Sequence, residues 1–338
     1  MKKLINDAEQ VVVESLEGLA LAHPDIIETH QEPLIVTRSA GTVKERGRVG
    51  LISGGGSGHE PLHAGFVGRG MLDAAVPGPV FTSPTPDPIM AATSFADQGA
   101  GVVYIVKNYT GDVLNFDTAA ELAEMEDIEV EQVLVDDDVA VEDSTFTAGR
   151  RGVAGTVLVE KVAGASAERG DDLQTVARLA RTAAKNVRSM GVALSACTVP
   201  HVGKPSFELG ENEVECGVGI HGEPGCERIP MASADEITDI LFDRVAQDLG
   251  LRAGESVVAL VNGMGGTPSS ELYIVYRRVA QRLAELGVED IRPMVGNYVT
   301  SLEMRGVSVT LMRLDEELAE LIDAPAHTIA WTRDSASS

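Results

Sequence analysis

The sequence predicts an α/β protein of two domains, each a mostly parallel sheet flanked by helices. The chain has 338 residues, which is more than one small hydrophobic core usually accommodates. Apolar runs of strand length alternate along it with longer helical patterns, an order that is typical of mixed α/β folds. Several runs, such as residues 101–106, are apolar almost throughout, as expected for strands that are buried on both faces.

The strands and helices follow one another in a regular order. The expected strands are Val49–Ser53, Gly101–Val106, Val130–Val135, Val192–Val199, Ser256–Val261 and Val307–Met312. The expected helices are Pro88–Asp97, Val113–Met125, Gly155–Ala167, Leu173–Met190, Ala234–Leu249, Ser269–Leu286 and Glu316–Ile322. Because five prolines fall between Pro77 and Pro88, that segment is predicted to be an ordered but irregular loop. The long helix that ends at Gly191 is the best domain boundary, which gives an N-terminal domain 1–190 and a C-terminal domain 191–338.

The charge of the chain limits its partners. Asp and Glu number 52 against 27 Lys and Arg, a formal net charge of −25. Such a surface repels nucleic acid and anionic membranes, and its self-repulsion is weakened by salt. We interpret the excess as adaptation to the salty cytoplasm of a halophilic organism, with an ordinary acidic bacterial enzyme as the alternative. No apolar run is long enough to cross a bilayer and the first residues lack a signal-peptide pattern, so the expected location is the cytoplasm.

The three cysteines do not predict a metal site. Cys197, Cys216 and Cys226 have spacings that fit no zinc pattern. We expect them to be small buried apolar residues and expect no metal on this chain.

A glycine-rich segment follows the first expected strand. Residues 53–61 read Ser-Gly-Gly-Gly-Ser-Gly-His-Glu-Pro, and glycines let a backbone approach a ligand closely. The segment lacks the Lys-Ser/Thr ending of a P-loop and has His59 where a dinucleotide fingerprint needs Gly or Ala. His59 and His63 match the zinc-protease pattern His-Glu-x-x-His, but Pro61 argues against a helix that carries both rings on one face. A small-molecule site and a tight turn without a ligand remain as interpretations.

In two further segments, polar or glycine-rich residues again follow an expected strand. Lys107 stands where the strand Gly101–Val106 leaves the sheet, and Asp112 stands at a helix start, where an ordinary N-cap is the alternative interpretation. Residues 262–268, Asn-Gly-Met-Gly-Gly-Thr-Pro, form a second glycine loop. They lack the P-loop Lys-Ser/Thr pair, which favours a structural turn or a partner contact over a phosphate site.

Four motifs in order carry a family resemblance. They are Gly-Gly-Gly-Ser-Gly-His-Glu-Pro at 54–61, Lys-Asn-Tyr-Thr-Gly-Asp at 107–112, Gly-Arg-Arg-Gly-Val-Ala-Gly-Thr at 149–156 and Gly-Ile-His-Gly-Glu-Pro-Gly at 219–225. In this order and spacing they resemble the K subunit of dihydroxyacetone kinase over nearly the whole chain, from residue 4 to about residue 314. The resemblance implies a homodimer of two-domain subunits with the active site between the domains.

The resemblance also implies roles for single residues. His221 would bond covalently to the carbonyl carbon of dihydroxyacetone and form a hemiaminal, a reaction that glycerol cannot undergo. Asp112 would act on the hydroxyl that is phosphorylated, and His59 would share that role. The backbone at Gly56 and the Lys107 side chain would contact the substrate.

The implied partners supply what the chain lacks. The resemblance implies no cofactor on this chain, and ATP or ADP with Mg²⁺ on a separate L subunit. The phosphoryl donor is either ATP or a relay that includes an M-type phosphotransfer protein, and both stay open. A dihydroxyacetone sensor without catalytic duty is the alternative function, although such a protein would have no need of Asp112 as a base.

Overall fold

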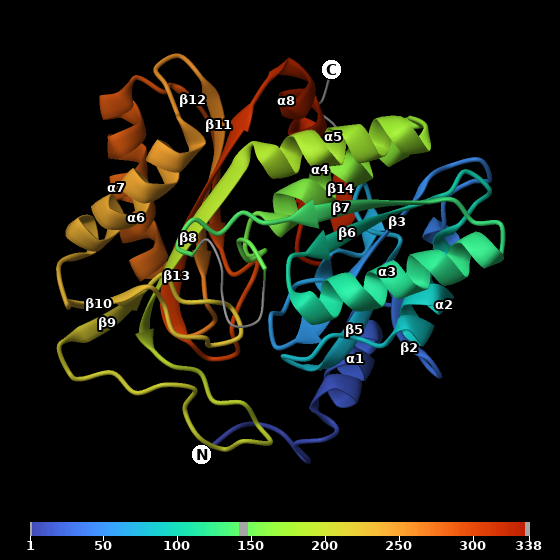
Figure 1. The fold of residues 1–338 in the computed structure, drawn as a ribbon, viewed down its shortest axis with the longest axis horizontal. Helices are drawn as coiled ribbons and strands as arrows, with labels where there is room; N and C mark the ends of the chain where they lie inside the picture. The colour runs from blue at the N-terminus through green and yellow to red at the C-terminus, as the bar shows by residue number, and fades with distance from the viewer. Residues whose placement is uncertain (1, 142–147, 335–338) are drawn as a thin grey trace.

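The computed structural model describes residues 2–141 and 148–334 and has an α/β architecture (Figure 1). Its two large sheets have six strands each among the described residues. The first sheet has the order β1 (Ile27–Gln31), β2 (Leu34–Arg38), β5 (Ala74–Val80), β3 (Gly50–Ser57), β6 (Val102–Lys107) and β7 (Val130–Val135). The second has the order β10 (Glu227–Pro230), β9 (Glu213–Cys216), β8 (Val187–Ser195), β13 (Arg305–Leu314), β11 (Ser256–Gly263) and β12 (Asp290–Gly296).

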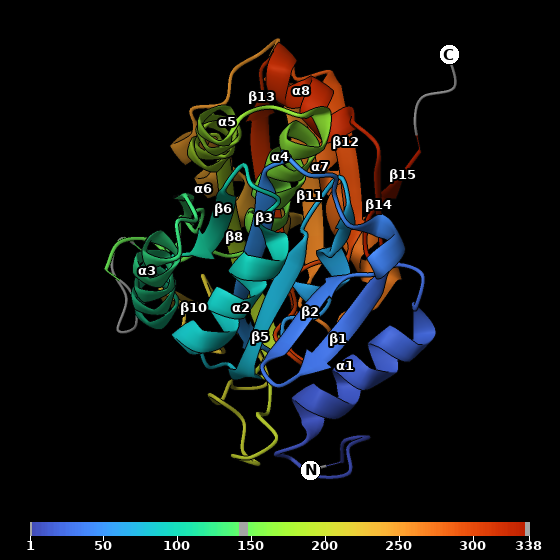
Figure 2. The same ribbon diagram turned by 90° about the vertical axis from the view of Figure 1, so that its right-hand side faces the viewer.

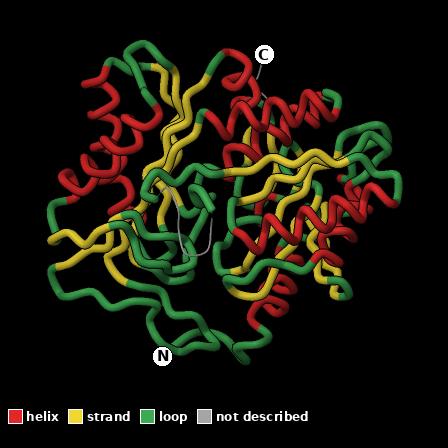
Figure 3. The backbone as a smooth tube through the Cα atoms, viewed as in Figure 1, coloured by secondary structure: helices red, strands yellow, loops and turns green. Residues whose placement is uncertain are grey.

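Helices cover both faces of each sheet (Figure 3). The described α-helices are α1 (Val11–Ala22), α2 (Pro86–Ala96), α3 (Thr110–Met125), α4 (Thr156–Arg169), α5 (Leu173–Lys185), α6 (Ala234–Leu249), α7 (Ser269–Leu286) and α8 (Glu316–Asp323). One core cluster joins α2 and α3 to the first sheet, and another joins α6 and α7 to the second. None of the helices in the described ranges combines the length and the apolar character that a membrane span requires.

Helix α4 lies between the two sheets (Figure 2). Every residue from Thr156 to Ala167 is buried. The same apolar cluster contains Leu51 and Val103 of the first sheet and Val258 and Leu260 of the second. A small third sheet of β4 (Gly68–Arg69), β14 (Ala326–Thr328) and β15 (Thr332–Arg333) also joins early and late parts of the chain. The division at residue 190 therefore stays a prediction, since both halves share a core.

The structure confirms the α/β class and corrects three details. The first sheet has parallel pairings at β5–β3, β3–β6 and β6–β7, but the second is mostly antiparallel, with only β11–β12 parallel among its described pairs. The helix expected to reach Met190 ends at Lys185, because Val187–Met190 already pairs with β13. The proline-rich segment is not an irregular loop throughout, because Pro77 and Pro79 belong to β5 and Pro86 opens α2 at a position that suits proline.

Candidate active site

The first part of the site lies just beyond the carboxyl end of β3. His59 is 1% exposed, and its Nδ1 lies 2.8 Å from the carbonyl oxygen of Thr300. Because a carbonyl only accepts, Nδ1 carries the proton and Nε2 has the lone pair. Burial, and after it the nearby His221 and Lys107, lower the pKa of His59 well below its ordinary 6.5, so the ring is neutral. Its Nε2 is buried without a hydrogen-bond partner and can accept a hydrogen bond from a ligand.

The second part comes from the neighbouring parallel strand β6. Lys107, the last residue of that strand, is fully buried and donates from Nζ to the carbonyl oxygen of Gly54 at 3.1 Å. A side chain at Gly55 would collide with the ammonium group, so the glycine loop makes room for this contact. Asp112 lies 3.6 Å from Nζ through its Oδ2, whereas its Oδ1 is buried without a partner.

The ordinary N-cap interpretation of Asp112 is wrong. The N-cap residue of α3 is Tyr109, and Asp112 is the third residue of the helix itself. Its carboxylate is therefore placed in the first turn, where the helix dipole favours a negative charge. The free oxygen is available to a ligand hydroxyl.

The third part is the loop between β9 and β10, residues 217–226, which carries His221. Oε1 of Glu223 lies 3.3 Å from Nδ1 of His221, and Oε2 accepts the backbone N–H of His221 at 3.0 Å. Burial raises the pKa of Glu223, but the hydrogen bond and charge of His221 and the charge of Arg151 together hold it below its ordinary value. The ionised carboxylate thus accepts a hydrogen bond from Nδ1–H, which leaves Nε2 as the nitrogen with a free lone pair.

These parts meet around the His221 ring. Its centroid lies 4.7 Å from that of His59, 4.4 Å from that of Tyr109 and 5.4 Å from that of Phe81. A cavity of about 880 Å³ is lined by Phe81, Tyr109, Asp112 and His221, among others. The predicted residues His221, Asp112, His59 and Lys107 therefore come together from both sheets.

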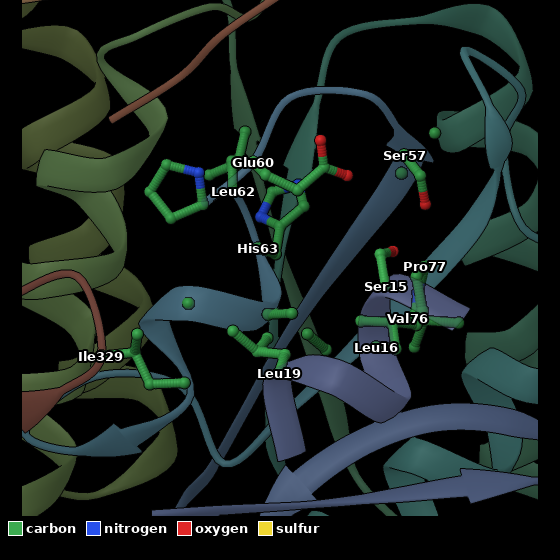
Figure 4. A pocket seen from close by; sticks show the side chains of 16 residues that line it. Ser15, Leu16, Leu19, Ser57, Glu60, Leu62, His63, Val76, Pro77 and Ile329 are labelled. Atoms are coloured by element: carbon green, nitrogen blue, oxygen red, sulfur yellow. The ribbon is translucent and has the colours of Figure 1, made fainter. Parts of the chain in front are cut away.

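Gly56 does not share this cavity. Phe81 and Thr82 occupy the space beside its Cα, and the residue lines a second cavity of about 330 Å³ that has no lining residue in common with the first. Figure 4 shows that cavity, with His63 and Glu60 on one side and Leu16 and Leu19 of α1 on the other. The contact of the Gly56 backbone with the substrate stays a prediction that the geometry does not favour.

Sequence reasoning missed Tyr109, Phe81 and Thr300. The hydroxyl of Tyr109 is buried without a partner, and burial, followed by the Glu223 charge, raises its pKa well above 10. Phe81 stacks on His59 with ring centroids 5.1 Å apart. Tyr109 stands inside the motif at 107–112, which was a usable signal, whereas Phe81 and Thr300 lie in segments with no motif.

The remaining sequence motifs have structural explanations. His59 and His63 lie in turns, not on an α-helix, and no group of three or more His, Cys, Asp or Glu in the described ranges could hold a metal ion. Cys197 and Cys216 are buried as expected, but Cys226 is exposed, because it lies in the loop that precedes the edge strand β10. The second glycine loop packs on residues 300–304, where Ser301 N–H donates to the carbonyl oxygen of Met264 and Gly266 N–H to that of Met304. This loop thus supports the segment that holds His59, as a structural turn does.

Fold and site together define an α/β protein whose site is built from segments that follow strands of two sheets and that bring two histidines, His59 and His221, side by side. The chain belongs to the Dak1 domain family, whose domain matches residues 17–330. It is 53% identical over 98% of its length to all of a protein from Listeria innocua named "PTS-dependent dihydroxyacetone kinase 1, dihydroxyacetone-binding subunit DhaK".

Two solved structures are similar over almost the whole chain. The dihydroxyacetone kinase of C. freundii matches with a TM-score of 0.88 and 35% identity, covering 100% of this chain and 63% of that one. A structure described as "Dihydroxyacetone kinase operon co-activator Dha-DhaQ" matches with a TM-score of 0.89 and 35% identity, covering 95% of this chain and 98% of that one.

Proposed function

We propose that this chain is the dihydroxyacetone-binding subunit of a cytoplasmic dihydroxyacetone kinase. One observation carries the proposal. Three buried polar atoms around the His221 ring have no protein partner: Nε2 of His59, Oδ1 of Asp112 and the Tyr109 hydroxyl. The rings of His59 and Tyr109 contact the His221 ring, and Tyr109 and Asp112 line the same cavity as His221. Buried polar groups normally have hydrogen-bond partners, so this group of atoms suits a small ligand rich in hydroxyls.

His221 is suited to covalent capture of a ketone. As its Nε2 bonds to the carbonyl carbon, the π electrons of the C=O bond move to oxygen and the ring becomes cationic. The Nδ1 proton can then pass to Glu223 and from there, directly or through solvent, to the new alkoxide, so the net result is a neutral hemiaminal and an ionised Glu223 again. Glycerol has no carbonyl, and the bond therefore selects dihydroxyacetone and fixes its terminal hydroxyl.

Asp112 is suited to the phosphorylation step. Its free Oδ1 can accept the proton of the terminal hydroxyl while that oxygen bonds to phosphorus, and His59 can accept a hydrogen bond at the same end. Lys107 adds positive charge beside Asp112. The nucleotide with Mg²⁺ would be bound by a separate L subunit, because the resemblance assigns none to this chain.

We infer that the donor is a phosphotransfer relay with an M-type protein, not free ATP. The support is that the relative named as PTS-dependent is 53% identical, against 36% for the C. freundii kinase, whose structure was solved in complex with AMP-PNP and Mg²⁺. We further propose a homodimer and a salty cytoplasm, the latter supported by the net charge of −25. A phosphorylation assay with the L subunit, with and without the relay proteins, tests the donor.

A co-activator that senses dihydroxyacetone is the second candidate. The structure of the operon co-activator, with a TM-score of 0.89, favours it. Asp112 with its unpartnered oxygen favours the kinase subunit, because a sensor needs no base. Turnover with a purified L subunit and the relay proteins identifies the kinase, and its absence in an otherwise active mixture identifies the sensor.

The covalent step is tested with a crystal soaked in dihydroxyacetone. We expect continuous electron density from Nε2 of His221 to the central carbon of the substrate. His221→Ala should lose the preference for dihydroxyacetone over glycerol in calorimetric titrations. A well-occupied ligand that leaves His221 unbonded contradicts the proposal.

A further inference from the structure

The second histidine of the segment 59–63 has no place in the mechanism above. His63 is 6% exposed and lies outside the cavity of His221, yet its ring touches a residue of the site. Its Nε2 lies 2.9 Å from Nζ of Lys107, and its Nδ1 lies 2.6 Å from Oε1 of Glu160 on α4. A continuous chain therefore runs from Glu160 through His63 to Lys107 and ends 3.6 Å from Asp112.

The chemistry of the partners fixes the proton on His63. An ammonium group has donors and no acceptor, so Nε2 of His63 must be the atom that accepts from Lys107. Burial, and after it the Lys107 charge, lower the pKa of His63 well below 6.5, so the ring holds a single proton. That proton is on Nδ1, where it is donated to Glu160.

Glu160 stands in an unusual place for an acid. It is fully buried in the middle of α4, the helix that lies between the two sheets. Burial raises the pKa of Glu160 to about 8, and the positive charge of Lys107 offsets only part of that rise. A glutamate buried at this depth lowers the stability of the fold, and the hydrogen bond that it accepts from His63 offsets part of this cost.

We propose that Glu160 and His63 are positioning residues for Lys107, which hold its ammonium group between the Gly54 carbonyl and Asp112. Two of the three N–H donors of Lys107 are then taken by Gly54 and His63, and the third is left for the Asp112 side, where the substrate hydroxyl would lie. In other sites, too, a side-chain oxygen that accepts from a histidine N–H orients a reactive group through the ring. This inference rests on the proposed kinase function, since it assigns residues to the same reaction.

The removal of the Glu160 carboxyl group should loosen the whole series of hydrogen bonds from Glu160 through His63 to Lys107. Without its carboxyl group, Nδ1–H of His63 has no acceptor, and the ring can exchange its proton between nitrogens. A ring protonated at Nε2 points a donor at an ammonium group, which drives Lys107 away from its position. The expected loss therefore falls on phosphorylation more than on the bond between His221 and the ketone.

The test compares three variants of the full chain, assayed with the L subunit. Glu160→Leu should lower kcat/KM by about tenfold or more, the usual effect of losing a group that orients a functional residue. Glu160→Gln keeps an oxygen for Nδ1–H and should restore most of the activity. Lys161→Met is the matched control, because Lys161 is the next residue of α4, equally buried, and donates to the Leu321 carbonyl and not to the site.

The tautomer of His63 gives an independent measurement on the unaltered protein. In ¹⁵N spectra of histidine-labelled protein, with His63→Gln used for assignment, Nδ1 should carry the proton and Nε2 none. A proton on Nε2, or equal activities for Glu160→Leu and Lys161→Met, overturns the inference. If unaltered protein bonds no dihydroxyacetone at His221, the proposed function fails instead, so the two failures are distinguishable.

Discussion

The two sides of the site hold their residues in different ways. On the side of the first sheet, Lys107 ends and Asp112 follows a strand buried between parallel neighbours, and their side chains are 0% and 3% exposed. On the side of the second sheet, His221 lies on the loop between β9 and β10, two short strands at the edge, and its side chain is 16% exposed. The side of the first sheet, which we call the dry side, is thus fixed in position and shielded from water. The side of the second sheet, the open side, can be reached from solvent.

The difference suits the two kinds of chemistry that we propose for the two sides. A base and a cation that act on a proton and on a phosphoryl group gain from a low dielectric and a fixed position. A nucleophile must meet an incoming carbonyl carbon, so it needs an open approach and one partner that orients it. Glu223 is that partner, and it contacts His221 through both of its oxygens.

The largest predicted effect comes from the dry side. Asp112→Asn keeps shape and hydrogen bonding but removes basicity, so phosphorylation with the L subunit should fall by roughly a hundredfold or more. Binding of dihydroxyacetone should survive, because His221 is untouched. Asp117→Asn on the exposed face of the same helix is the control. Unchanged turnover in Asp112→Asn would remove that residue from the mechanism and end the contrast between the two sides.

A smaller effect is expected on the open side. Glu223→Leu leaves Nδ1 of His221 without an acceptor, so the ring loses its fixed tautomer, and binding of dihydroxyacetone should weaken by about tenfold. Glu223→Gln should bind better than Glu223→Leu. Glu215→Gln is the control, since Glu215 accepts the N–H of Gly225 and ties the same loop without touching the ring. Calorimetric titration of the three variants gives the comparison, and equal affinities for Glu223→Leu and Glu215→Gln would show that the loop, not the ring contact, matters.

Sequence reasoning recovers most of the dry side, because local patterns encode it. The apolar run predicted as Gly101–Val106 becomes β6, Val102–Lys107, and the glycine loop leads to His59, which lies near enough to feel the Lys107 charge. The helices Ala234–Leu249 and Ser269–Leu286 also have the predicted bounds, because capping residues such as Ser233 and the following glycines mark their ends.

What the sequence does not encode locally is the pairing of distant segments. The antiparallel order of the second sheet depends on which strands meet, and the strands β9 and β10 are too short to have a pattern. The partners His59–Thr300 and His63–Glu160 are 241 and 97 residues apart in sequence. One signal was available: Glu160 and Lys161 are adjacent charges in the otherwise uncharged helical run 155–167, and such residues are rarely buried without a partner.

The charged residues of both sides share one property, burial, and a salt series can test its consequence. Lys107, Asp112 and Glu223 are buried, whereas the acidic excess of the chain, −25, belongs mostly to exposed residues. Screening acts on exposed charges, and the Debye length falls from about 10 Å at 0.1 M salt to about 3 Å at 1 M. Salt should therefore stabilise the fold and leave the site unchanged.

We accordingly expect the melting temperature and the dimer fraction to rise together from about 0.1 M to several molar potassium chloride. The rise should continue after screening saturates, because salt also strengthens apolar burial. The affinity for dihydroxyacetone, a neutral molecule, should stay constant wherever the protein is folded. Thermal scans with light scattering measure the first pair, and calorimetry measures the second. Sucrose is the control, since it favours burial without screening charge and should reproduce only the late part of the rise. A flat melting temperature would make the acidity incidental, whereas an affinity that changes with salt would mean that the charges on the dry side are reached by solvent ions after all.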